Sequence, residues 1–284
     1  MRRKIVSQGH DTLTVTLPAA WVRKHALKAG NELDMDVQGN ALILSTNKKD
    51  FTEKTIDLRG RKDDYSRWML AALYKQGIDE LSIHCESQKQ VELVRKRIKE
   101  CLPGYQAIEE NGAHLRVRLI QKSDESQMRP LLRRMFRITI AMGFSLLERR
   151  RNVERIESFE EENDLLANTI EKILVRQDGA AHFLFIIVWQ LEKIADQYKH
   201  LAKYLGKRAL SKHETVQLKA AVNYLNEFSN AYVKRDEEVL ENLINKRKKL
   251  LVETYKRDMA PELRFYITNL IDKTADLAGP ILAL

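Results

Sequence analysis

The spacing of hydrophobic positions divides the chain into three parts. From residue 3 to about 46, short apolar runs alternate with turn residues, and Thr12 to Leu17 has the period of two expected of a half-buried strand. Between 47 and 123, strand-like runs alternate with helical patterns, which predicts a small two-layer α/β domain. From residue 124 onward the period is helical. We therefore predict a multidomain protein with parts at 1–46, 47–123 and 124–284.

The middle and last parts have distinct predicted elements. The middle part predicts the order β-α-β-α-β-β, with strands at 54–58 and 81–85, helices at 63–74 and 91–102, and a hairpin of 105–108 with 115–120. The last part predicts an all-α body of six helices, at 126–151, 153–178, 180–206, 213–233, 236–257 and 261–283. A run of cations between Arg95 and Lys99 is predicted to be an exposed helix face rather than a DNA contact.

Composition narrows the function classes. No apolar run approaches the roughly 18 residues of a membrane span, and a strand-like segment follows the basic start, so we expect no membrane insertion and a cytoplasmic protein. Two cysteines exclude a disulfide framework, and nucleotide-binding glycine loops and hydrolase elbows are absent, so we expect no enzyme. The net charge is +9, and residues 1 to 28 hold six cations against one acid. That local excess favours nucleic acid as a partner.

The first part is too small to bury much apolar surface by itself, so dimerisation would stabilise it. Its runs Thr14 to Val22 and Leu27 to Leu33 resemble the AbrB/MazE/SpoVT family, with Asn31 where aspartate is usual. The resemblance implies an all-β swapped-hairpin head, a homodimer, and DNA contacts from the basic residues Arg2, Arg3, Lys4, Arg23 and Lys24, with the turn at 8–10 as a further candidate. A small β module with no DNA role is the alternative.

A short acidic phrase occurs twice, 80 residues apart. Leu191 to Asp196 matches Ile271 to Asp276, which suggests two three-helix bundles related by duplication. Each phrase places two carboxylates at i and i+4, where like charges repel each other unless something compensates. A hard cation would resolve the repulsion, with an acidic run at 160–164 as a facing wall. The alternative is a solvated acidic face, or carboxylates answered by basic residues of another helix.

The body as a whole resembles the PhoU family, on the phrase Leu191 to Asp196 and on Asp164 to Glu171. The resemblance implies metal ligands at Glu192, Asp196, Asp272 and Asp276, with the second pair weaker because its phrase is altered, and a metal such as magnesium, manganese, iron or zinc. The order of head, α/β unit and body is similar to that of archaeal phosphate-uptake regulators.

Together these features predict a DNA-binding transcriptional regulator of phosphate homeostasis with a sensor body. One alternative is a PhoU-like regulator that contacts a phosphate transporter or signalling partner and uses its head only to dimerise. Another is an antitoxin-like module, which the long structured body disfavours. Transporter genes beside this gene would favour the first two, and a small toxin gene the third.

Overall fold

The structure is a computed structural model that describes residues 2–9, 12–38, 41–46, 51–120, 127–175, 181–256 and 258–284. The chain forms two compact units, Met1–Phe51 and Thr52–Leu284. We call residues 2–46 the head; the second unit contains an α/β domain, 52–120, and a helical body, 127–284. The predicted boundaries at 46/47 and 123/124 lie beside or within segments outside the described residues.

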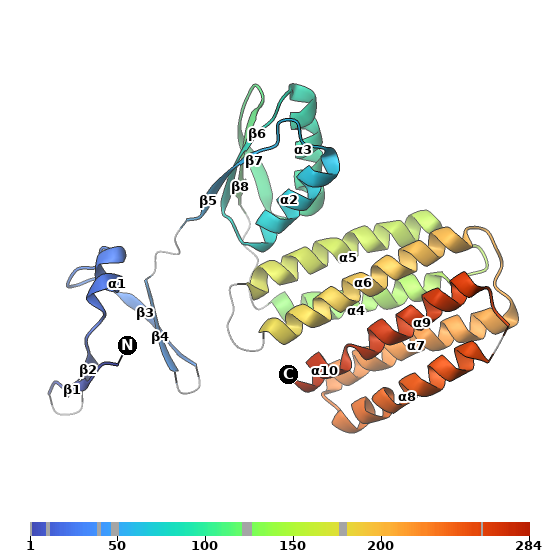
Figure 1. Cartoon of the computed structure of the whole chain (residues 1–284). Helices are drawn as coiled ribbons and strands as arrows, with labels where there is room; N and C mark the ends of the chain where they lie inside the picture. The colour runs from blue at the N-terminus through green and yellow to red at the C-terminus, as the bar shows by residue number, and fades with distance from the viewer. Residues whose placement is uncertain are drawn as a thin grey trace. The chain divides into compact units, whose positions relative to one another are not determined.

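In its described residues, the head has two separate β-ribbons and one short helix (Figure 1). Strands β1 (Ile5–Ser7) and β2 (Leu13–Val15) pair antiparallel, with Ile5 opposite Val15. Strands β3 (Leu33–Gln38) and β4 (Ala41–Thr46) form the second antiparallel pair. Pro18, whose fixed φ suits a helix start, is the N-cap of α1 (Ala19–Lys24). Residues 39 and 40, between β3 and β4, lie outside the described residues.

The α/β domain has the predicted element order. It comprises β5 (Glu53–Asp57), α2 (Asp63–Lys75), β6 (Glu80–His84), α3 (Gln88–Cys101), β7 (Tyr105–Asn111) and β8 (His114–Leu119). The sheet order is β5-β6-β8-β7, in which β5 and β6 are parallel and the other pairs antiparallel. Alternate strand residues such as Leu81, Ile83 and Leu115 are buried with Leu70 and Val94 of the helices, so α2 and α3 cover one face of the sheet.

The helical body contains α4 (Met128–Ser145), α5 (Val153–Leu174), α6 (Ala181–Leu205), α7 (Lys212–Lys234), α8 (Glu237–Tyr255), α9 (Pro261–Ala275) and the short α10 (Ala278–Leu282). Side chains of Asn152, Ser211 and Asp236 cap α5, α7 and α8, each accepting a hydrogen bond from a backbone N–H of the first turn. Figure 1 shows the long helices lying side by side.

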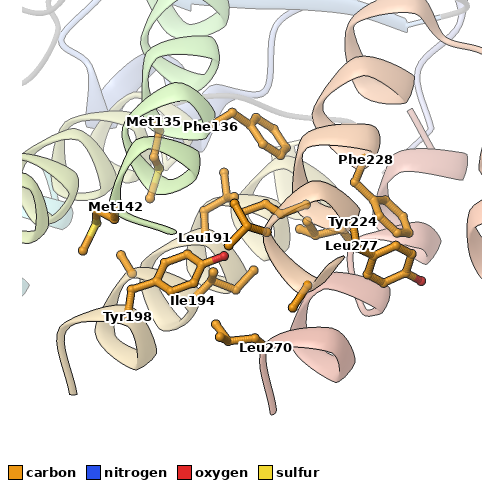
Figure 2. Close-up of a cluster of buried hydrophobic side chains, with 14 of the residues drawn as sticks. Met135, Phe136, Met142, Leu191, Ile194, Tyr198, Tyr224, Phe228, Leu270 and Leu277 are labelled. Atoms are coloured by element: carbon orange, nitrogen blue, oxygen red, sulfur yellow. The ribbon is translucent and has the colours of Figure 1, made fainter. Parts of the chain in front are cut away.

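One cluster of buried side chains runs through all six long helices. Figure 2 shows its central part, where Phe136 of α4, Tyr198 of α6 and Phe228 of α7 are fully or almost fully buried. Helices α4, α5 and α6 contact one another, as do α7, α8 and α9, and α4 with α7 and α6 with α9 join the two sets. The two sets of three helices therefore share one core.

Two predicted helix ends differ from the structure. The helix predicted at 126–151 ends at Ser145, because the chain must turn before Asn152 caps α5. The helix predicted at 261–283 is divided between α9 and α10, and around residue 277 the backbone forms a tighter i→i+3 bond from Leu277 N–H to Thr274 O. The nearby Pro280 has no N–H to donate.

Candidate functional site

The five predicted DNA-contacting cations lie on the surface of the head. Arg2, Arg3 and Lys4 directly precede β1, and Arg23 and Lys24 form the last turn of α1. All five side chains are exposed, and none pairs with a carboxylate in the part of the chain that the structure describes. Cations without intramolecular partners are available to phosphate oxygens. Of the turn at 8–10, residue 10 lies outside the described residues.

The head also exposes apolar side chains that a finished domain would bury. Leu13 is 69% exposed and Val37 is 72% exposed, and no described side chain of residues 2–46 is buried. A two-stranded ribbon is marginal in water unless its apolar side chains pack on something. The two ribbons thus have unfilled packing surfaces, as expected for half of an intertwined pair.

The basic run on α3 is not a free cationic surface. Arg97 pairs with Asp63 at the start of α2 and with Glu100, while Arg95 pairs with Glu110 of β7. These carboxylates neutralise much of the run, in keeping with its prediction as an ordinary helix face.

Two lysines of α6 form ion pairs with the first predicted carboxylate pair, Glu192 and Asp196. Lys193 Nζ lies 3.3 Å from Glu192 Oε1 and 3.2 Å from Asp196 Oδ2, and Lys199 Nζ lies 3.7 Å from Asp196 Oδ1. Lysines of the same helix therefore neutralise the negative charges of this pair. Burial lowers the pKa of Lys193, but the carboxylates of Glu192 and Asp196 raise it. The net result is a pKa above the ordinary value of lysine.

The second pair, Asp272 on α9 and Asp276 at its C-cap, has partners on other helices. Arg247 of α8 donates from Nε to Asp272 Oδ1 at 2.9 Å, and Gln190 of α6 donates to Asp276 Oδ2 at 3.3 Å. Within the described ranges, no group of three or more His, Cys, Asp or Glu has the arrangement to hold a metal ion. Metal binding at these four residues stays a prediction, and a metal there would have to displace lysine and arginine partners.

Of the predicted acidic wall on α5, Glu160 and Asp164 lie near the first pair, whereas Glu162 pairs with Arg134 of α4. Burial raises the pKa of Asp164 to about 7, and the negative charges of Glu160, Glu192 and Asp196 act in the same direction. Glu160 is itself buried and pairs with Lys199. Four carboxylates and two lysines thus form one charged network between α5 and α6.

The network continues into a contact with the α/β domain that the sequence patterns missed. Arg67 of α2 lies 3.3 Å from Asp164, and Lys75 of α2 lies 2.7 Å from Glu171 of α5, whose side chain is 1% exposed. Lys172 Nζ lies 4.3 Å from the ring centre of Tyr74 and 4.8 Å from that of Tyr105. No short sequence spacing links α2 to α5, because the partners are nearly 100 residues apart.

Comparison with known families agrees with the head. Residues 6–52 match the family described as antidote-toxin recognition MazE, bacterial antitoxin. The match supports an N-terminal MazE/AbrB-like domain, a class that suggests DNA binding and dimerisation. No curated protein and no solved structure matches the chain. Across the described helices, none is long and apolar enough to span a membrane.

Proposed function

We propose that this protein is a homodimeric, cytoplasmic DNA-binding transcriptional regulator, without catalytic activity, whose helical body senses a signal related to phosphate supply. The observation that carries the proposal is the head: a MazE/AbrB-like segment with exposed, unpaired cations beside unfilled apolar surfaces. Dimerisation fills those surfaces and places two sets of cations on one molecule, as two DNA half-sites require.

The role proposed for the body is supported by the repeated acidic phrase and by the resemblance of its motifs to those of the PhoU family. In this proposal α4–α6 and α7–α9 are the two duplicated bundles, and the α5–α6 charged network is where proton, metal or ligand state alters the body. The contacts of Arg67 and Lys75 with α5 provide a physical route from the body to the α/β domain.

Recovery of genomic DNA bound to the full-length protein, with and without phosphate in the growth medium, tests the proposal. We expect discrete sites near phosphate-uptake genes, with occupancy that changes with phosphate. Recovery of no DNA, together with co-purification of a transporter or signalling protein, would favour the alternative in which the head only dimerises.

The family description makes an antitoxin role the second candidate. Such a protein would neutralise a toxin encoded beside its own gene. Co-expression with any small neighbouring gene product distinguishes the two roles. An antitoxin would neutralise the toxicity of that product, whereas a regulator of phosphate uptake would leave that toxicity unchanged.

A further inference from the structure

Arginines gather where the start of α4 meets the end of α7. Arg129, Arg133 and Arg137 are exposed and spaced by four residues, so they form one stripe along α4. Arg235 follows the last residue of α7, which packs against α4. None of these four forms an ion pair with any described carboxylate, whereas the neighbouring Arg134 pairs with Glu162.

One phenol lies at the same junction of α4 and α7 as these cations. The ring of Tyr232 on α7 stacks on Phe136 of α4, with ring centres 5.5 Å apart and planes at 27°, so the ring is held in place. Burial raises the pKa of Tyr232, and the charges of Arg129, Arg133 and Arg235 each act to lower it. Tyr232 and Arg235 are three residues apart at the end of α7. Phe136, on which the tyrosine ring stacks, follows Arg133 by three residues on α4, so the phenol and the arginines lie at the same junction of the two helices.

Arg235 also has an unfavourable backbone conformation. Its φ of 54° and ψ of 47° lie in the left-handed region, where the position after a helix ordinarily has glycine. Arginine is strained there, and its side chain contributes no described ion pair that would compensate. Strained residues cluster at active sites and ligand-binding sites, so the Arg235 side chain is a candidate ligand contact.

We propose that Arg129, Arg133 and Arg235, with the Tyr232 hydroxyl, form a binding site for a phosphate group. Like charges at i and i+4 repel each other, and a third cation from the next helix adds to that repulsion. A phosphate offsets it, because guanidinium groups pair with its oxygens through two parallel hydrogen bonds each. The phosphate group belongs either to free phosphate or a small phosphate ester, or to a DNA backbone.

Titration calorimetry of the full chain with inorganic phosphate at constant ionic strength tests the first source. The cluster variant is Arg133→Gln with Arg235→Gln. The matched control is Arg149→Gln with Arg150→Gln, which removes the same charge from exposed residues beyond the other end of α4. We expect phosphate to bind the wild type and the control equally, and the cluster variant at least about tenfold more weakly, since each charged hydrogen bond that is removed contributes that much.

The same three proteins titrated with duplex DNA test the second source. If phosphate binds none of them, but only the cluster variant loses DNA affinity and part of its salt dependence, the phosphate group is that of a DNA backbone. If wild type, cluster variant and control behave alike toward both phosphate and DNA, the proposal is wrong. The phosphate titration does not depend on DNA binding by the head, so the two proposals can fail separately.

Arg235→Gly separates ligand binding from stability. Glycine adopts the left-handed conformation without strain, so this variant should have a higher Tm than the wild type in the absence of phosphate. It should nevertheless bind the phosphate-bearing ligand more weakly. A variant with both a higher Tm and unchanged affinity for both ligands would show that Arg235 is not part of the site.

Discussion

The head and the helical body bury their apolar residues to opposite extents. In the body, Tyr198 and Phe228 are at most 1% exposed, and one packed cluster joins six helices. In the head, strand residues such as Leu13 and Val37 are mostly exposed, and no side chain whose burial the structure describes is buried between the two ribbons. The body therefore buries its apolar side chains within one chain, whereas the exposed apolar side chains of the head agree with the dimerisation that the MazE/AbrB-like match suggests.

The largest expected effect is on the head. In Leu13→Asp, a dimer interface would have to bury an unpaired carboxylate at a cost of several kcal/mol. We expect the dimer to dissociate at micromolar concentration in analytical ultracentrifugation. Val216→Asp changes an equally apolar but exposed residue of α7 and should leave the dimer intact. A Leu13→Asp protein that remained dimeric would remove the contrast between head and body.

Next in size is the contact between the α/β domain and the body. Lys75→Met leaves the Glu171 carboxylate buried without its partner, and should lower the free energy of unfolding by about 2–3 kcal/mol. Denaturant unfolding measures this decrease. Adding Glu171→Gln should recover most of it, because the buried charge is then gone. If adding Glu171→Gln lowered the free energy of unfolding further, the result would contradict the pairing of Lys75 with Glu171.

Close packing in the body predicts that one added methyl group destabilises the protein. A Cβ at Gly143 would lie 2.7 Å from Val222 Cγ2 and 2.9 Å from Tyr198 Cζ, in the middle of the core. Gly143→Ala should therefore destabilise the protein by about 1–3 kcal/mol despite alanine's better helix propensity. Gly279→Ala, where a Cβ meets nothing within 4 Å, is the matched control and should be nearly neutral. Equal Tm values for the two variants would show a looser core.

The smallest effect concerns pH. Burial and three neighbouring carboxylates raise the pKa of Asp164 from 3.8 to about 7. The folded state therefore holds the proton more tightly than the unfolded state, and stability falls as pH rises from about 4 to about 7. Asp164→Asn mimics the protonated form, so its stability advantage over the wild type should grow across that range and then level off. An advantage independent of pH would mean that Asp164 titrates normally.

Sequence patterns predicted elements far better than contacts. The period of two and the helical stripes located every long helix and the strands of the α/β domain, because each pattern reflects a single buried face. Contacts between side chains of different elements could not be predicted from these patterns. The partner of Asp272 is Arg247, 25 residues away on α8, and that of Glu171 is Lys75, on a different domain. Spacing on one helix showed which carboxylates needed a partner, but not whether a metal or a cation of another helix supplies it.

The central claim is that the head binds DNA through Arg2, Arg3, Lys4, Arg23 and Lys24. The most direct test is the salt dependence of duplex DNA binding, measured by fluorescence anisotropy for the full chain and for a variant with all five replaced by alanine. The control replaces Arg149, Lys207, Lys219, Lys248 and Lys249, five exposed cations of the body. We predict that the head variant binds DNA far more weakly and that its salt slope falls by about one unit for each DNA phosphate it no longer neutralises, while the control keeps both affinity and slope. Equal slopes for the two variants would contradict the assignment of DNA binding to the head.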